Sequence, residues 1–456
     1  MNKSGLNIRH IVAGAFVVVV VYFAYGPPFL NKALYALAGD NFFRTVRGIM
    51  RVWLIAVMAG FLIGVAIAKL LSPLPLFARG VARFLRIVRW TPFLLWFVLA
   101  VSIAGSPRGY WIFLYGALAV ALTPCYKLLA LSPLNLSTSE RLRSVFNASL
   151  FQGMLIAVYL IMVAAVDLWM GAYPGAIFIG HKVFFVLACV ILLLNWLSRE
   201  TFESAAADHG KVLLAELKNE NWQSLATAFG IIVAFFSLWQ LLEMLGDHDG
   251  VLYTSPANIA AAFLKMMPDN QLGNDFYVSV SEMAMGIAAS GVIAVILISV
   301  IDRIGGAKRI LDVMIQATQI APLALLPDLM LLRVGGFEYW SAICVAVFVF
   351  YPIVTVFYGL RAEPFLVRMT LAVDAALPYA AAGIVYGEAM QATAGLGFVM
   401  VVAGATRELD KGMVAFFVLI SLVALLSALL RRFAKAGFFA PTSEAEPLPP
   451  PASAAA

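Results

Sequence analysis

The sequence predicts an all-α, polytopic membrane protein with about twelve transmembrane helices, arranged as two parallel six-helix repeats. Three observations predict this fold class. Only 12% of the 456 residues are charged and 63% are hydrophobic. The mean hydropathy is +0.93. The apolar residues are gathered into long runs, most of which can cross about 30 Å of hydrocarbon. Together these features exclude a soluble globular enzyme.

Six apolar runs in the first part of the chain are followed by six more in the second part. The first six are residues 11–29, 49–71, 90–103, 110–131, 148–170 and 183–197. The second six are residues 225–245, 283–301, 315–332, 341–360, 375–403 and 413–430. The runs at 90–103 and 183–197 are short, which leaves open whether they cross fully or are tilted or re-entrant.

The paired runs define the domain organisation. An even number of spans in each repeat places both repeats the same way up, related by an axis along the membrane normal. Pro92 and Pro322 open the third spans, and Pro124 and Pro352 lie in the fourth spans, which supports the repeat. The predicted units are a first repeat at 1–198, a polar linker at 199–223, a second repeat at 224–436 and a disordered Pro/Ala-rich tail at 437–456.

The charge distribution predicts the orientation. The net charge is +6, with 31 Lys and Arg residues. With the N-terminus in the cytoplasm, about two thirds of these residues fall on the inner side, as the positive-inside rule requires. We therefore expect a multi-pass protein of a bacterial plasma (inner) membrane with both termini in the cytoplasm, and no nucleic-acid partner.

Four arginines form a basic stripe after the second predicted span. Arg79, Arg83, Arg86 and Arg89 follow one another at intervals of three or four residues, which places them on one face of a helix. We expect an amphipathic helix that anchors the protein beside anionic lipid on the inner membrane surface. The alternative is a docking surface for a cytoplasmic partner.

Acids and prolines within the spans are the candidates for function. An intramembrane carboxylate is costly and is therefore a candidate for a role in transport. We expect Asp328 and Glu388 to line a translocation path, with Pro322, Pro327 and Pro352 breaking or bending helices beside it. An interhelical hydrogen bond or an interfacial position is the structural alternative for both acids.

The sequence does not indicate enzyme chemistry. It has no Gly-Lys-Ser/Thr phosphate-binding loop. Its four histidines and three cysteines lack the spacing of a metal site. We expect no catalytic residue, no metal and no cofactor in this chain.

The second repeat carries an ordered set of motifs between residues 252 and 400. They are LYTSPANIAAAF at 252–263, SVSEMAMGIAASGV at 279–292, LDVMIQATQIAPLALLPDLMLL at 311–332, FYPIVTVFYGLRAEP at 350–364, ALPYAAAGI at 376–384 and AGLGFVM at 394–400. In this order they resemble the permease subunit of ATP-binding-cassette importers of the taurine/nitrate/sulfonate type. The first repeat is then expected to be a degenerate copy, fused where the family usually has two identical subunits.

The resemblance implies a permease that forms the translocation path for a small solute, such as an oxyanion. Its implied partners are membrane lipid, a cytoplasmic ATPase subunit that binds the ATP, and an extracytoplasmic solute-binding protein. The sequence departs from the family at the cytoplasmic loop after the fourth span, where family members carry a Glu-Ala-Ala start and a Gly in a short helix that contacts the ATPase. Residues 361–374 and 132–147 lack that pattern. Remnants of the contact are expected at Arg361, Glu363, Arg368 and Asp374, and at Glu140, Arg141 and Arg143.

Two alternatives remain open at this stage. Without the coupling loop, the chain could be a permease-derived membrane subunit that no longer transports and holds other proteins in a complex. It could also be a transporter driven by an ion gradient, with Asp328 and Glu388 as proton-carrying groups.

Overall fold

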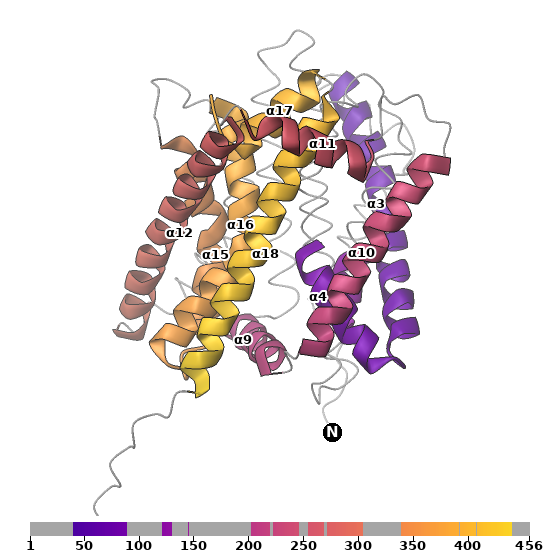
Figure 1. The fold of residues 1–456 in the computed structure, drawn as a ribbon. Coiled ribbons are helices and arrows are strands. Elements are labelled where there is room, and N and C mark those ends of the chain that lie inside the picture. The colour runs from indigo at the N-terminus through magenta and orange to yellow at the C-terminus, as the bar shows by residue number, and fades with distance from the viewer. Residues whose placement is uncertain are drawn as a thin grey trace, which may run out of the picture.

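The computed structural model describes residues 40–88, 121–129, 145, 202–218, 222–245, 254–268, 271–303, 339–391, 393–406 and 408–439. Within these residues every regular element is a helix. The long helices lie side by side, with α9 at one end of the bundle and α11 across the other; we call these the α9 end and the α11 end (Figure 1). The helices are α3 (Asp40–Leu71), α4 (Pro75–Val88), α9 (Phe202–Lys218), α10 (Trp222–Leu245), α11 (Pro256–Met266), α12 (Gln271–Arg303), α15 (Trp340–Gly359), α16 (Phe365–Gln391), α17 (Leu396–Thr406) and α18 (Leu409–Phe439), and a short helical segment covers 121–129.

Five of the described helices are long and apolar enough to span a membrane, namely α10, α12, α15, α16 and α18. This confirms the prediction of a polytopic, all-α membrane protein. The five helices correspond to five of the six spans predicted for the second repeat. The remaining predicted span, 315–332, lies outside the described residues. In the first repeat α3 covers the predicted span at 49–71. The total of about twelve spans and the repeat stay predictions, and below the first repeat and the second repeat are names for residues 1–198 and 224–436 only.

Two predicted boundaries in the second repeat were wrong. The run at 375–403 is not one span, because α16 ends at Gln391 and a separate helix, α17, begins at Leu396. Gly395, which lies between the two helices, has a φ of 119°, a backbone conformation that residues other than glycine rarely adopt. At its other end α16 begins at Phe365, so most of the predicted inner loop at 361–374 is helical.

Helices α12 and α15 run in the same direction. The Ser290 hydroxyl of α12 donates a hydrogen bond to the carbonyl oxygen of Ala346, at 2.5 Å. Four residues earlier, Gly286 lies against Ala342 of α15. Position along one helix therefore increases with position along the other. This is the relation expected between the second and fourth spans of a repeat.

Helix α15 packs tightly against α16 through two glycines. A Cβ added at Gly383 would lie 2.8 Å from the Cα of Val345, and one at Gly387 would lie 2.6 Å from the Cα of Ser341. The two backbones approach this closely because neither glycine carries a side chain, as is common where membrane helices associate. The order of these contacts also shows that α16 is antiparallel to α15.

The predicted linker at 199–223 contains a helix that closes the α9 end of the second repeat. Ala206, Leu213 and Leu217 of α9 are buried in the same apolar core as α15 and α16. Gly210 of α9 lies against Gly359, the last residue of α15. The linker is therefore a packed part of the bundle.

Helices α4 and α10 connect the first repeat with the second. Gly80 of α4 lies against Thr227 near the start of α10, and Leu85 of α4 packs with the 121–129 segment. Further along α10, toward the α11 end, the ring of Phe236 lies 5.3 Å from that of Phe417 of α18. Helix α10 thus contacts the first repeat near one of its ends and α18 nearer the other.

We predict that Gly387→Ala lowers the thermal unfolding midpoint of the purified protein, because the added methyl group must push α16 away from the backbone of α15. Overpacking of this kind costs about 1–3 kcal/mol. The matched control is Gly230→Ala on α10, where a Cβ meets nothing within 4 Å. Equal midpoints for the two variants would contradict the close packing of α15 on α16.

Candidate functional site

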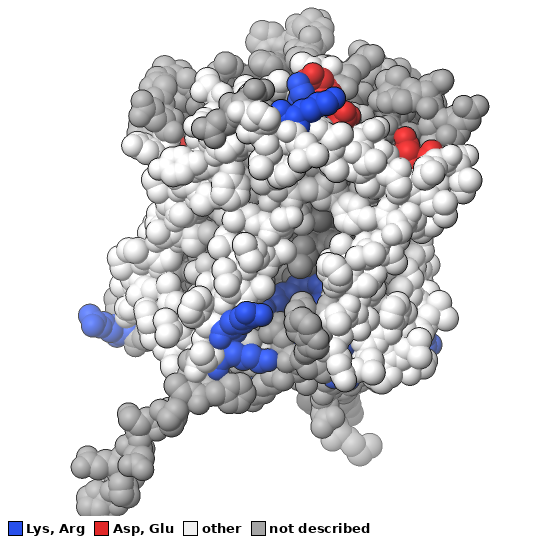
Figure 2. All heavy atoms as spheres, in the orientation of Figure 1, with Lys and Arg blue, Asp and Glu red and all other residues white. Residues whose placement is uncertain are grey.

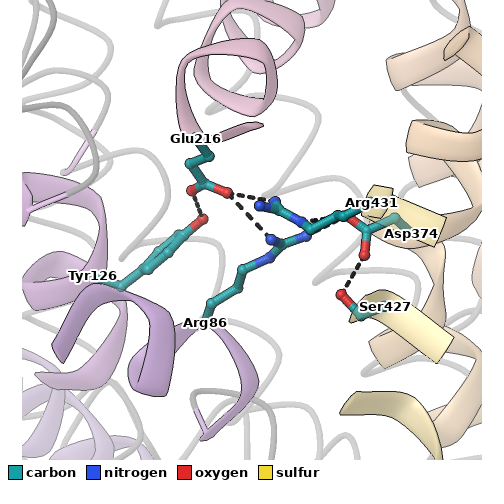
Figure 3. A network of polar contacts seen from close by, with 6 residues as sticks. All are labelled: Arg86, Tyr126, Glu216, Asp374, Ser427 and Arg431. Atoms are coloured by element: carbon teal, nitrogen blue, oxygen red, sulfur yellow. Dashed lines mark hydrogen bonds and ion pairs between the residues drawn. The ribbon is translucent and has the colours of Figure 1, made fainter. Parts of the chain in front are cut away.

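A buried cluster of charged side chains lies where the two repeats and the linker helix meet. Arg86 comes from the last turn of α4, Glu216 from the last turn of α9, Asp374 from α16 and Arg431 from α18 (Figure 3). We call these four residues the charge cluster. Segments that are far apart in the sequence thus bring two positive and two negative charges together.

Arg431 contacts both carboxylates of the charge cluster. Its Nε lies 3.1 Å from Asp374 Oδ2, and its Nη2 lies 2.8 Å from Glu216 Oε2. A guanidinium presents its N–H donors in a fixed planar fork, so one arginine can join two acceptors in this way.

Arg86 contacts the same two carboxylates from the side of the first repeat. Its Nη2 donates to Asp374 Oδ2, and its Nη1 lies 3.6 Å from Glu216 Oε2. Each arginine therefore faces both acids, and the charge cluster has no net charge.

Two hydroxyl groups complete the bonding of the acids. Ser427 of α18 donates to Asp374 Oδ1, and Tyr126 of the 121–129 segment donates to Glu216 Oε1. Ser427 and Arg431 are four residues apart, so they lie on one face of α18 and both reach Asp374. Figure 3 shows these side chains converging from the first repeat, the linker helix and the second repeat.

The charge cluster is shielded from solvent. The exposed fraction of the side chain is 0% for Asp374, 5% for Arg431, 13% for Glu216 and 15% for Arg86. Burial alone disfavours the charged form of Arg86, but the carboxylates of Asp374 and Glu216 outweigh burial and raise its pKa. Removing one member of such a cluster leaves an uncompensated buried charge, which is far more costly than losing a surface ion pair.

Basic side chains gather on the surface at this end of the molecule. Figure 2 shows them toward the α9 end. This end also carries the turn between α15 and α16, so it combines the charge cluster with the predicted partner-contact segment.

A second polar arrangement lies at the α11 end, at the first turn of α17. Backbone amides at a helix start have no partner within the helix, and here side chains of α12 and α16 accept their hydrogen bonds. The pairs are Gly395 N with Asp275 Oδ1 (2.8 Å), Leu396 N with Ser279 Oγ (2.8 Å) and Gly397 N with Glu388 Oε2 (2.6 Å).

Glu388 is the centre of this arrangement. Its side chain is fully buried, and its other carboxylate oxygen accepts a hydrogen bond of 2.5 Å from the hydroxyl of Ser279. A negative side chain at a helix N-terminus is also favoured by the helix dipole. The structure thus gives Glu388 the interhelical hydrogen bonds that were its structural alternative, and its role in a translocation path stays a prediction.

The other predicted path residues fall in different places. Pro352 lies inside α15 and is buried in the core. Pro322, Pro327 and Asp328 lie outside the described residues.

Of the predicted ATPase-contact residues that the structure describes, three lie at or beside the turn between α15 and α16 and one is buried. Arg361 and Glu363 lie in the turn after α15, with the Arg361 guanidinium 5.0 Å from the Tyr358 ring centre. In the first turn of α16, Arg368 donates through Nε to the carbonyl oxygen of Phe357. For Asp374 the prediction of an ATPase contact was wrong, because its side chain has no exposed surface and bonds to Arg86. The first-repeat candidates, Glu140, Arg141 and Arg143, lie outside the described residues.

The predicted basic stripe is helical, but its members differ in their surroundings. Arg79 is exposed and its Nε donates to the carbonyl oxygen of Pro75 in its own helix, which fits a position at the membrane surface. Arg83 is partly buried. Arg86 was wrongly predicted as a lipid anchor, because it points to Asp374 and Glu216. Arg89 lies outside the described residues.

Sequence reasoning missed four residues of this region: Glu216, Arg431, Tyr126 and Ser427. Glu216 and Arg431 were interpreted as ordinary charges of inner segments. The only signal was the i, i+4 spacing of Ser427 and Arg431 after an apolar run, and such a pair is also common at the end of a span.

Comparisons with known proteins identify no family for this chain, since no family model, no curated protein and no solved structure matches it. The geometry of the two polar arrangements is therefore the basis for any functional conclusion.

We predict that Asp374→Asn destabilises the protein by about 3–5 kcal/mol, because two buried arginines then share one carboxylate. The double variant Asp374→Asn/Arg431→Gln restores a neutral pair, Arg86 with Glu216, and should recover part of this loss in thermal or denaturant unfolding. The control is Glu408→Gln, which removes an exposed ion pair with Lys411 and should change stability by less than about 1 kcal/mol. A double variant less stable than Asp374→Asn would contradict the charge balance.

We predict that Gly395→Ala destabilises the α11 end. Its φ of 119° is unfavourable for alanine, and the new Cβ would overlap the carboxylate of Glu388. The strain of such a backbone costs about 1–3 kcal/mol. Gly291→Ala is the control, since its Cβ meets only the flexible end of Met369 at 3.7 Å. Hydrogen exchange of the α17 amides should rise in Gly395→Ala and stay unchanged in Gly291→Ala; equal exchange would count against the capping role.

Proposed function

We propose that the chain is the membrane-spanning permease component of a binding-protein-dependent importer, with the translocation path between its two repeats. The substrate is a small oxyanion, and ATP is bound by a separate cytoplasmic subunit. The observation that carries this proposal is the charge cluster. It joins the first repeat, the linker helix and the second repeat through polar contacts that water can replace when the repeats separate.

The distribution of basic residues supports a cytoplasmic location for the α9 end. Lys and Arg are retained on the inner side of a membrane more often than on the outer side. The described exposed charges of the α11 end, by contrast, have both signs, with Lys265 and Lys411 beside Glu408 and Asp410. The exposed basic residues of the α9 end are Lys69, Arg79, Lys211, Arg303, Arg361 and Arg432.

The turn between α15 and α16 is the proposed contact for the ATPase. Arg361, Ala362 and Pro364 are exposed there, followed by the exposed apolar side chains of Phe365 and Leu366. An exposed arginine beside two exposed apolar side chains suits a partner surface that combines an acidic and an apolar patch.

The shortness of the same turn favours a second candidate function. Only residues 360–364 separate α15 from α16, which leaves no room for a separate coupling helix, and α9 covers the neighbouring end of α15. A permease-derived membrane subunit that holds other proteins in a complex fits this geometry as well. An experiment must therefore identify what binds at the turn.

We predict that a photo-crosslinking amino acid in place of Ala362 captures an ATP-binding subunit when the tagged full-length chain is irradiated in its own cells. The same group in place of Leu264, which is exposed at the α11 end, should not capture it. Mass spectrometry of the adducts identifies the partner. Adducts at residue 362 with integral membrane proteins alone would reject the importer and support the second candidate.

A further inference from the structure

The contacts of the charge cluster divide unequally between the two repeats. Asp374, Ser427 and Arg431 all belong to α16 and α18, and they bond to one another within the second repeat. Only Arg86 and Tyr126 come from the first repeat. A movement of α4 and the 121–129 segment away from α9, α16 and α18 must therefore break the contacts of Arg86 and Tyr126, and it can leave the others intact.

Arg431 already has the geometry to hold both acids without Arg86. It contacts Asp374 through Nε at 3.1 Å and Glu216 through Nη2 at 2.8 Å. If Arg86 withdraws, each carboxylate keeps one cationic partner. Arg86 cannot replace Arg431 in the same way, because the loss of Arg431 would leave Asp374 and Glu216 dependent on a residue from the other repeat.

Helix α10 contains a contact about which α4 could turn relative to α18. Near its start, α10 packs on α4 through Thr227 and Gly80. Toward the α11 end, the rings of Phe236 and Trp239 lie tilted against Phe417 of α18, at 5.3 Å and 6.2 Å between ring centres. Aromatic contacts of this kind resist separation but tolerate small changes of angle.

We propose that the charge cluster is a latch that closes the α9 end and opens on its Arg86 side. In the open state α4 moves away from α9, α16 and α18, and Arg86 enters water. Arg431 stays with Asp374 and Glu216, while the contact of α10 with α18 at Phe236, Trp239 and Phe417 acts as the hinge. The opening itself does not depend on the proposed function. Only the reason for the opening, which is to admit solute to the α9 end, rests on that function.

The test measures the separation of the two repeats in the purified full-length protein. Spin labels are placed at Ser72→Cys and Ala362→Cys, which are exposed turn positions of the first and second repeat at the α9 end, after Cys125, Cys189 and Cys344 are replaced by alanine. Double electron–electron resonance then gives the distribution of distances between the labels. We expect Arg86→Gln to add a longer distance and to raise the ratio of long to short distances by about tenfold or more, as expected for the loss of a charge-assisted hydrogen bond.

The matched control is Arg79→Gln. It removes the same charge from the same helix, but Arg79 bonds within α4 and should leave the distribution unchanged. If Arg86→Gln does not fold, Arg86→Lys replaces it; lysine keeps the charge but loses the fork that reaches both acids, so the longer distance should again appear.

An unchanged distribution in the folded Arg86 variant, or the same change in Arg79→Gln, would overturn the latch. The measurement needs neither an ATPase nor a substrate. Failure of the latch is therefore distinguishable from failure of the importer assignment, which depends on the cross-linking at residue 362.

Discussion

A buried charge needs a partner wherever water is absent, and this constraint organises the described part of the molecule. In a hydrocarbon environment no solvent can replace a missing hydrogen bond. The charge cluster meets this requirement by joining Arg86, Glu216, Asp374 and Arg431 in a neutral group with two hydroxyl donors. Because its members come from the first repeat, the linker helix and the second repeat, the need for neutrality ties together segments that are far apart in the chain.

The same constraint is met differently at the α11 end. There the groups that need partners are backbone amides at the start of α17, and the acids Asp275 and Glu388 supply acceptors. This arrangement joins α12, α16 and α17, all of which belong to the second repeat. The two arrangements therefore join different helices: the one at the α11 end joins α12, α16 and α17, whereas the charge cluster joins α4 to α9, α16 and α18.

The sequence predicted what depends on local chemistry. Apolar run length located α10, α12, α15 and α18, and the arginine spacing located α4. It failed where the answer depends on a distant segment. Asp374 and Arg86 were both identified as functional candidates, but nothing in either segment indicates that they meet. The break between α16 and α17 was missed because the run at 375–403 was interpreted as one span, and hydropathy cannot reveal the positive φ of Gly395.

The two kinds of helix contact indicate which surfaces can move. Between α15 and α16, Gly383 and Gly387 bring backbones together, so even a small displacement loses close packing along the whole interface. Between α4 and the helices α9, α16 and α18, Arg86 contacts Glu216 and Asp374, and these polar groups can exchange a protein partner for water, whereas α4 packs closely on α10 at Gly80. A membrane protein that must open between two bundles needs this combination, with rigid packing inside a bundle and replaceable polar contacts between bundles. The described residues have both, and the replaceable contacts lie at the end that carries the basic residues and the turn at 360–364.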